Sequence, residues 1–172
     1  MDLSDFIRSI PDFPKRGIIF RDVTTLFSEP VAFKEMISQF SEIWSSKEVN
    51  YIAGIDARGF IIGGALAYSL GAGFVPLRKE GKLPYKTFTE NYTLEYGTET
   101  LEIHIDAVPK GCNVLLVDDL IATGGTALAA INLLKQLKTN VIGATFLVDL
   151  PDLKGTQKIS DLKIPVKSLC SF

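Results

Sequence analysis

Cysteine and histidine are scarce in this chain of 172 residues, which contains two cysteines and a single histidine. Cys112 and Cys170 lie in apolar, strand-like segments without the spacing of a metal site, and His104 has no cysteine or histidine companion. The composition therefore disfavours a disulfide scaffold and a zinc site. We expect the two cysteines to be small core residues and His104 to be a structural strand residue.

Long apolar runs and an excess of positive charge are also lacking. No apolar run approaches the roughly 18 residues that a membrane span requires, and the formal net charge of -2 provides no overall basic surface for nucleic acid. The first residues, "MDLSDFIRSIPDF", contain early acids and no continuous apolar segment, unlike a secretory signal or a basic transit peptide. We therefore expect a cytoplasmic protein without membrane or nucleic-acid partners.

The segments that are present alternate between strand-like and helical patterns, and the length suits one domain over residues 1–172. Helical segments follow the first and the third of four apolar runs, and each ends near glycine or asparagine. This alternation predicts an α/β fold with a doubly wound, mainly parallel sheet. The expected strands are residues 51–56, 73–77, 113–119 and 140–150, the third of which is apolar enough to be buried on both faces.

One more helix is expected in the segment "SEPVAFKEMISQFSEIW". Ser28 is the expected N-cap, and Pro30 suits the first turn because it needs no N–H partner there. Apolar residues at helical spacing form a stripe that we expect to face the core. They are Phe33, Met36, Ile37, Phe40, Ile43 and Trp44.

Two regions do not follow the alternation. Residues 1–27 precede the first strand-helix unit and are broken by proline and glycine, and residues 78–98 form a long polar connection between expected strands. Loops of that length inside a compact domain are usually functional covers or disordered. We expect residues 78–98 to be such a loop.

The stretch "VDDLIATGGT" carries the clearest chemical signal. Asp118 and Asp119 end an expected parallel strand, where open α/β sheets bind ligands. The turn that follows presents backbone N–H groups at a helix N-terminus, which suits a phosphate, and carboxylates beside it suit the hydroxyls of a ribose. The turn has no lysine after its glycines, so it is not the loop of nucleotide triphosphatases. The phosphate-binding residues predicted here are Ala122, Thr123, Gly124, Gly125 and Thr126.

Taken with four further motifs, this stretch resembles the type I phosphoribosyltransferases, and among them the members that act on adenine. The other motifs are "IPDFPKRGIIFRD", "AGIDARGF", "LRKEGKLP" and "LEYG", in the family's order from about residue 7 onward. One departure is Arg16, which stands where the family pattern leads us to expect proline. The resemblance implies the family's sheet, an N-terminal hood at about 1–30 and a mobile cover loop at about 80–96.

The resemblance also implies a reaction and its partners. Members of this family transfer the phosphoribosyl group of 5-phospho-α-D-ribose 1-diphosphate (PRPP) to a base, so adenine and PRPP would give AMP and pyrophosphate. Mg²⁺ would act mainly through PRPP and water, with no direct protein ligand. A homodimer is expected. A transferase for another base and a non-catalytic sensor of PRPP or purines are the alternatives.

Site roles follow from the same resemblance. Ile19, Phe20 and Arg21 would contact adenine, with the Phe20 ring stacked on the base. Arg58 would be catalytic, and cations and N–H groups would stabilise the pyrophosphate. The predicted pyrophosphate-binding residues are Ala57, Arg58, Gly59, Arg78, Lys79 and Lys82.

Glu95, in the cover loop, is the second expected catalytic residue, and Tyr96 would orient that loop. Glu95 could exchange a proton with adenine or stabilise positive charge on the sugar, and the sequence leaves both roles open. Structural interpretations stand beside these roles. Glu95 would then be a solvated acid, Arg58 an ion-pair partner, Phe20 a core residue, and Lys79 and Lys82 solubilising side chains.

Overall fold

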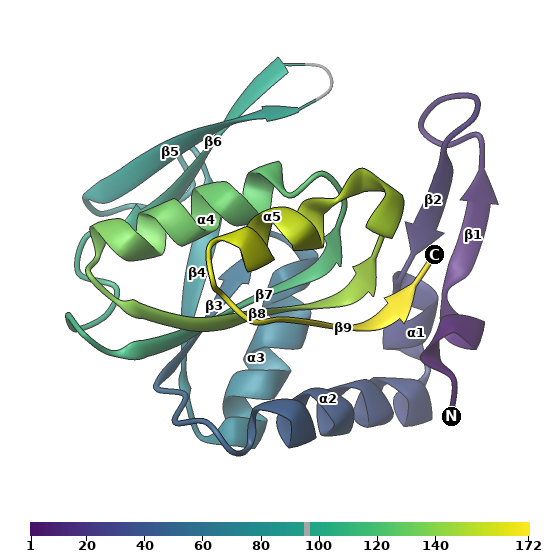
Figure 1. Ribbon diagram of the computed structural model, residues 1–172, viewed down its shortest axis with the longest axis horizontal. Helices are drawn as coiled ribbons and strands as arrows, with labels where there is room; N and C mark the ends of the chain where they lie inside the picture. Colours follow the sequence, from purple (N-terminus) through teal and green to yellow (C-terminus); the bar gives the residue numbers. More distant parts are fainter. Residues whose placement is uncertain (95–96) are drawn as a thin grey trace.

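A sheet of seven strands forms the centre of the structure, in the order β5-β6-β4-β3-β7-β8-β9 (Figure 1). The computed structural model describes residues 1–94 and 97–172. Five neighbouring strands run parallel: β3 (Tyr51–Ile55), β4 (Gly73–Lys79), β7 (Asn113–Ile121), β8 (Asn140–Asp149) and β9 (Val166–Ser171). The other two, β5 (Thr87–Leu94) and β6 (Gly97–His104), form an antiparallel hairpin at one edge. The prediction of a mainly parallel sheet is confirmed.

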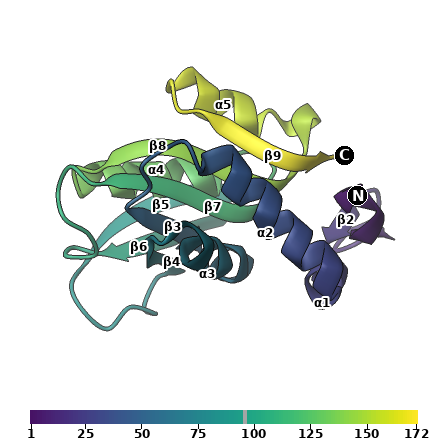
Figure 2. The same ribbon diagram turned by 90° about the horizontal axis from the view of Figure 1, so that it is seen from below.

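Helices cover both faces of this sheet (Figure 2). α2 (Pro30–Trp44) and α3 (Arg58–Leu70) pack on one face, and α4 (Gly125–Gln136) and α5 (Gly155–Asp161) pack on the other. The short helix α1 (Thr24–Ser28) precedes α2, and two 3-10 turns are η1 (Leu3–Phe6) and η2 (Pro151–Leu153). The fold is therefore doubly wound, as predicted.

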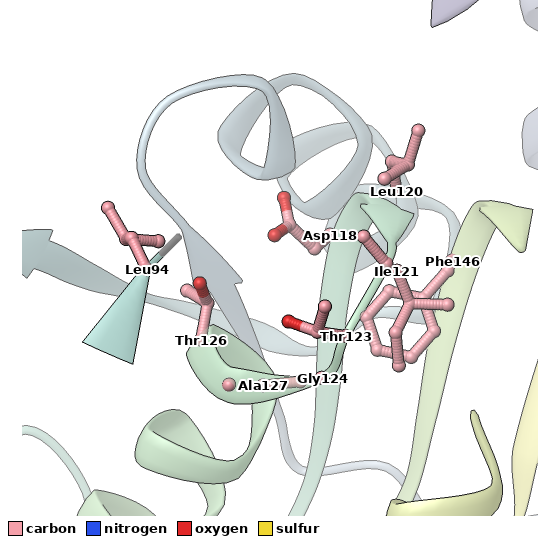
Figure 3. Close-up of a pocket in the computed structure, with 11 residues that line it drawn as sticks. Leu94, Asp118, Leu120, Ile121, Thr123, Gly124, Thr126, Ala127 and Phe146 are labelled. Carbon is pink, nitrogen blue, oxygen red and sulfur yellow. The ribbon is translucent and has the colours of Figure 1, made fainter. Parts of the chain in front are cut away.

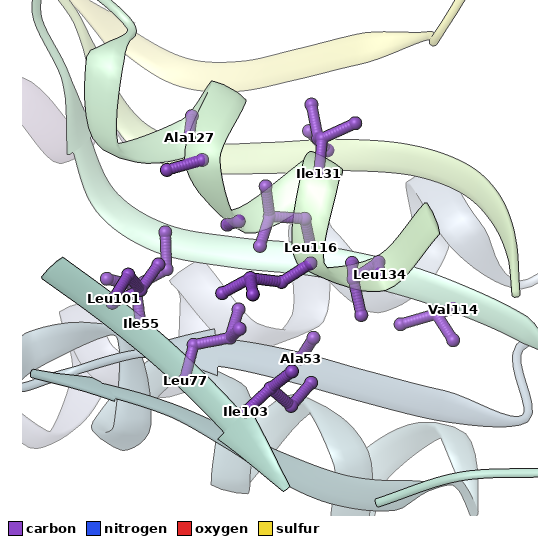
Figure 4. Close-up of a cluster of buried hydrophobic side chains, with 14 of the residues drawn as sticks. Ala53, Ile55, Leu77, Leu101, Ile103, Val114, Leu116, Ala127, Ile131 and Leu134 are labelled. Carbon is purple, nitrogen blue, oxygen red and sulfur yellow. The ribbon is translucent and has the colours of Figure 1, made fainter. Parts of the chain in front are cut away.

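Two apolar cores follow from the two-residue period of the strands. In β7, Leu115 and Val117 belong to the core shared with α2 and α3, whereas Val114 and Leu116 belong to the core shared with α4 (Figure 4). All four side chains are fully buried. The apolar run at residues 113–119, which we expected to be buried on both faces, therefore lies in a strand that is buried on both faces.

The helix α2 buries the predicted apolar stripe, with Met36, Phe40 and Trp44 in the core. Its N-cap is Glu29, whose carboxylate accepts a hydrogen bond of 3.5 Å from the N–H of Val31. The prediction of Ser28 as the N-cap is therefore wrong. Pro30 occupies the first helical position itself, so the cap falls on the residue directly before it, and Ser28 ends α1 instead.

The loop predicted for residues 78–98 is wrong in part, because much of it is strand. Residues 87–94 form β5, which pairs with β6 from Thr87 opposite His104 to Leu94 opposite Gly97. Phe88 and Tyr92 face the core beside α4, while Thr89 and Asn91 are exposed. The described part of the expected cover, residues 80–94, therefore consists of a short irregular segment followed by a strand, and it is not one continuous loop.

The N-terminal region is an antiparallel ribbon of β1 (Arg8–Pro11) and β2 (Ile19–Asp22). The Asp22 carboxylate accepts hydrogen bonds from Thr24 and from the Arg8 side chain. These bonds, that of Thr24 first, lower the pKa of Asp22 to about 2. These bonds fix the ribbon to the start of α1. That residues 1–30 act as a hood over the site stays a prediction.

Arg16 lies in the turn that joins β1 to β2, where it is exposed to solvent. The next residue, Gly17, has a φ of +88°, which glycine adopts more readily than other residues, and its N–H donates to Asp12. The position at which we expected proline therefore lies at the far end of the ribbon (Figure 1).

The remaining sequence predictions concern cysteines and membrane spans. Both Cys112 and Cys170 are free thiols. Cys170 is buried in the core shared with α2 and α3, whereas Cys112 is half-buried against the core shared with α4. Across residues 1–94 and 97–172, no helix combines the length and the apolar character needed to cross a membrane.

Candidate functional site

Asp118 and Asp119 lie near the carboxyl end of β7, which continues to Ile121 and does not end at residue 119 as predicted. Successive side chains of a strand point to opposite faces, so the two carboxylates make different contacts. Asp119 is 5% exposed, and its Oδ2 accepts a hydrogen bond of 2.5 Å from Arg58 Nε. Asp118 Oδ1 accepts one of 2.9 Å from the backbone N–H of Asp119. One acid is thus paired with a cation and the other with backbone.

The charge of Asp118 is poorly compensated. Burial raises the pKa of the Asp118 carboxyl well above its ordinary value, and the neighbouring charge of Asp119 raises it further, against the smaller opposing effect of Arg58. A carboxyl group held in this way at the edge of a sheet is typical of a functional site, because folding alone would favour a neutral residue there.

Gly59 allows α3 to approach β7 at this point. A Cβ atom on Gly59 would lie 2.9 Å from Asp118 Oδ1 and 2.9 Å from the carbonyl oxygen of Val117, which is closer than a side chain can come. The helix α3 begins at Arg58 with Ala57 as its N-cap. The first turn of α3 therefore lies beside the two acids, and the N–H groups at the start of a helix favour an anion.

The turn between β7 and α4 is built on a second glycine. Gly124 is the N-cap of α4 and has a φ of +86°, a conformation that residues with side chains rarely adopt. A cavity of 200 Å³ lies on this turn, and Figure 3 shows Leu94 and Thr123 on either side of it. All five residues of the predicted phosphate-binding turn line it: Ala122, Thr123, Gly124, Gly125 and Thr126.

A second cavity, of 560 Å³, adjoins the first, since Leu94, Asp118 and Thr126 line both. Its other walls come from the carboxyl ends of β3 and β4, the start of α3 and the hairpin. They are Ile55, Asp56, Ala57, Arg58, Lys79, Tyr92, Glu99 and Asp119. Each cavity thus contains a helix N-terminus, and Asp118 lies between them with Asp119 in the second cavity. This arrangement suits a sugar with phosphate groups at both ends.

The predicted cations are placed unequally around the second cavity. Arg58 and Lys79 line it, and Lys79 Nζ lies 3.4 Å from Glu99 Oε1. Arg78 is not in the lining, and its Nε donates a hydrogen bond of 3.0 Å to Asp56 Oδ2. Lys82 is exposed and lines neither cavity. The structure therefore brings two of the four cations to the acids.

Tyr92 and Glu99 are cavity residues that the sequence reasoning missed. The Tyr92 hydroxyl donates a hydrogen bond of 2.7 Å to Glu99 Oε2 across the hairpin. Burial, together with this bond, raises the pKa of Tyr92 to about 12, and the same bond lowers the pKa of Glu99. The pattern "TFTENYTL", which alternates apolar and polar residues, could have identified the strand that carries Tyr92.

The residues predicted to bind the base follow one another in β2 and are Ile19, Phe20 and Arg21. Ile19 is 52% exposed, and the Phe20 ring packs edge-on against Phe13 with centroids 5.2 Å apart. Arg21 donates to Ser9 Oγ and lies over the ring of Phe172, 4.1 Å from its centroid. None of the three lines either of the two cavities. The structure therefore places them in the ribbon and not in the walls of these cavities.

Two predicted residues, Glu95 and Tyr96, lie outside the described residues, between β5 and β6. Within the described ranges, no three histidine, cysteine, aspartate or glutamate side chains are grouped so that they could hold a metal ion. The acids of the second cavity are instead paired with cations, except for Asp118.

Comparison with known proteins places this site in a family. The model of the phosphoribosyl transferase domain matches residues 23–169. The adenine phosphoribosyltransferase of Methylorubrum populi is 55% identical over 170 residues, which cover 99% of this chain and 94% of that protein.

Solved structures agree with this result. The crystal structure of adenine phosphoribosyltransferase from Thermoanaerobacter pseudethanolicus superimposes with a TM-score of 0.94 at 45% identity, covering 99% of this chain and 98% of that one. The Saccharomyces cerevisiae enzyme, solved in complex with an imino-altritol bisphosphate and adenine, gives a TM-score of 0.90 at 42% identity, covering 97% and 96%.

Proposed function

The chain belongs to the phosphoribosyl transferase family, and within it to the adenine phosphoribosyltransferases, and from this we propose which of its residues bind each part of the substrates. The reaction transfers the 5-phosphoribosyl group of PRPP to adenine and gives AMP and pyrophosphate. The substrate carries a phosphate at one end of the ribose and a diphosphate at the other, so it needs two anion sites with a hydroxyl-binding group between them.

The 5-phosphate is assigned to the 200 Å³ cavity. Its turn offers the N–H groups of Thr123 to Thr126 and the hydroxyls of two threonines, at the positive end of the α4 dipole. Glycine at 124 and 125 leaves the backbone accessible to the phosphate oxygens. The ribose hydroxyls would then donate to Asp118 and Asp119, which lie near the end of the strand that precedes the turn.

The diphosphate is assigned to the 560 Å³ cavity. The N–H groups of Ala57 and Arg58 at the start of α3 and the cations Arg58 and Lys79 converge there, and the predicted N–H of Gly59 would follow them although Gly59 does not line the cavity. Arg58 contacts Asp119 through Nε, which leaves the terminal amino groups of its guanidinium for the diphosphate. Negative charge grows on the leaving pyrophosphate during the transfer, so these groups bind it more strongly in the transition state than before.

Mg²⁺ is proposed as the cofactor, carried mainly by oxygens of PRPP and by water. The described acids that line the second cavity fit this arrangement, because Asp56, Glu99 and Asp119 each pair with a cation and, among these four, Asp118 alone has no ion pair. A hard cation that keeps several water ligands needs no more from the protein. When bound, the ion would neutralise charge on the diphosphate.

Adenine is assigned to the ribbon that carries Ile19, Phe20 and Arg21. The Phe20 ring would stack on the base, and the backbone of exposed Ile19 would read its edge. A backbone carbonyl accepts from the 6-amino group of adenine but meets an acceptor in a 6-oxo purine, which costs about 1 to 3 kcal/mol per unpaired group. Arg78 and Lys82 would add positive charge from the far side of the second cavity.

Glu95 remains our candidate for proton transfer at the base, with Tyr96 orienting it, and residues 80–96 would exclude water from the reacting sugar. The anomeric carbon gains positive charge as pyrophosphate leaves, in an oxocarbenium-like transition state, and the acids of β7 stabilise it. A homodimer and a cytoplasmic location stay part of this proposal.

A single observation carries the assignment, namely that two cavities, each at a helix N-terminus, meet at Asp118. The test is a base-specificity assay with PRPP and Mg²⁺, in which adenine, hypoxanthine, guanine and xanthine are supplied separately and the nucleotide is identified by mass. We expect AMP from adenine and little product from the 6-oxo purines. Product from a 6-oxo purine at a similar rate would contradict the assignment of the base to β2.

A further inference from the structure

The phosphate-binding turn is held from behind by the helix α5. The N–H of Gly155 donates a hydrogen bond of 3.1 Å to the carbonyl oxygen of Ala122, and Lys158 Nζ donates one of 2.8 Å to the carbonyl oxygen of Thr123. α5 thus contacts two successive carbonyls of the turn, 35 residues away along the chain in the case of Lys158.

These two bonds determine where the turn directs its N–H groups. In a trans peptide the C=O and the following N–H point in opposite directions. Because the carbonyls of Ala122 and Thr123 point toward α5, the N–H groups of Thr123 and Gly124 point away from it. The 200 Å³ cavity lies on that other side, since Thr123 and Gly124 line it and no residue of α5 does. Successive N–H groups aimed at one point form an anion-binding concavity.

Close packing leaves the turn little freedom to reorient. A Cβ atom on Gly124 would lie 3.0 Å from the Cα of Gly155, and one on Gly155 would collide with the Ala122 carbonyl oxygen. α5 is itself anchored, because Thr156 Oγ1 donates a hydrogen bond of 2.8 Å to Asp149 Oδ1 at the end of β8. The contact between turn and helix is therefore part of the rigid structure of the sheet edge.

Lys158 also supplies a charge that the turn lacks. No lysine follows the glycines of the turn, unlike in the loop of nucleotide triphosphatases. The ammonium group of Lys158, bonded to a carbonyl of the turn, brings a positive charge to the side of the turn that faces away from the cavity. Resting on the function proposed above, we propose that Lys158 is a positioning residue for the 5-phosphate: it fixes the Thr123–Gly124 peptide and adds positive charge to the turn.

Calorimetric titration of the full protein with ribose 5-phosphate and, separately, with pyrophosphate and Mg²⁺ tests this. Lys158→Met keeps the apolar stem and removes the donor and the charge. We expect ribose 5-phosphate to bind about tenfold more weakly, as for the loss of one charged hydrogen bond, while pyrophosphate affinity changes less than about twofold because that site lies at α3. The KM for PRPP should rise and kcat change little.

Two controls separate this role from general damage. Lys158→Arg retains a charged donor and should restore most of the affinity for ribose 5-phosphate. Lys34→Met removes an exposed lysine from α2, on the opposite face of the sheet, and should bind both ligands like the parent protein.

The outcomes are distinct. Unchanged ribose 5-phosphate binding in Lys158→Met would overturn the proposal, and so would an equal loss of affinity for both ligands. If the parent protein formed no AMP and bound neither ligand, the function proposed above would fail, and the role of Lys158 with it.

Discussion

Arg58 of α3 and Asp119 of β7 form an ion pair in the wall of the second cavity, with Nε and Oδ2 2.5 Å apart. The sequence assigns the arginine to pyrophosphate and the acid to the ribose, and the structure joins them directly. Each therefore orients the other, and a change in one alters the site of both substrate groups. Asp118, one residue away, is left without an ion pair.

Removing the charge of Asp119 should lower kcat/KM for PRPP. Asp119→Asn retains an oxygen for Arg58 but loses the charge that holds the guanidinium and accepts from the ribose. We expect kcat/KM for PRPP to fall by about 10- to 100-fold in steady-state assays. Asp152→Asn, at an exposed acid of η2, is the matched control. An Asp119→Asn enzyme with the parent's kcat/KM would rule out this role.

Asp118 should reduce stability at neutral pH in exchange for its function. The pKa of Asp118 is raised in the folded state by burial and by the charge of Asp119. The contribution of Asp118 to the free energy of unfolding is therefore fully present below the pKa of an unfolded aspartate, and it is lost as the pH rises through the folded pKa. Asp118→Asn should therefore unfold at higher denaturant concentration than the parent at pH 7, with a smaller difference near pH 4.5, while losing activity. A difference that is the same at both pH values would contradict this.

Gly59 and Gly64 of the same helix should respond to alanine in opposite directions. At Gly59 the added methyl would meet Asp118 Oδ1 and the Val117 carbonyl at 2.9 Å, whereas at Gly64 it would meet nothing within 4 Å. Gly59→Ala should destabilise by about 1 to 3 kcal/mol, and Gly64→Ala should stabilise by about 0.5 to 1 kcal/mol through helix propensity. Urea unfolding of both variants measures this. Equal effects would show that α3 has room to move away from β7.

Tyr92→Phe should loosen the hairpin at the second cavity. The lost hydroxyl leaves Glu99 without its hydrogen bond of 2.7 Å, which should cost about 1 to 2 kcal/mol in urea unfolding and bring the pKa of Glu99 back up. Tyr85→Phe is the control, because Tyr85 is 56% exposed. Titration of Glu99 by NMR checks the second effect. An unchanged pKa of Glu99 would show that the hydroxyl does not stabilise the carboxylate.

The sequence predicts those elements whose signal is local. The four apolar runs, the glycine turn after Asp119 and the stripe of α2 each need only hydrophobic period, turn chemistry and helix geometry, and all are present. The observed N-cap of α2 lies one residue after the predicted one, because Pro30 at the first helical position determines where the helix starts more strongly than Ser28 favours a cap.

The features that the sequence reasoning missed depend on contacts between elements. Strand β5 has an alternating pattern, but its many polar residues led us to predict a loop, and pairing with β6 makes it a strand. Tyr92 and Glu99 meet only across that pairing, and Lys158 meets Thr123 only because α5 packs behind the turn. Nothing in the spacing of these residues along the chain indicates that they are neighbours.

The most direct measurement is a crystal structure of the protein with AMP, pyrophosphate and Mg²⁺. We predict the 5-phosphate within hydrogen-bond distance of the N–H groups of residues 123–126, the ribose hydroxyls at Asp118 and Asp119, and pyrophosphate at the start of α3 beside Arg58. A phosphate bound elsewhere while the turn at 122–126 stays empty would contradict the division of the site into two anion cavities that meet at Asp118.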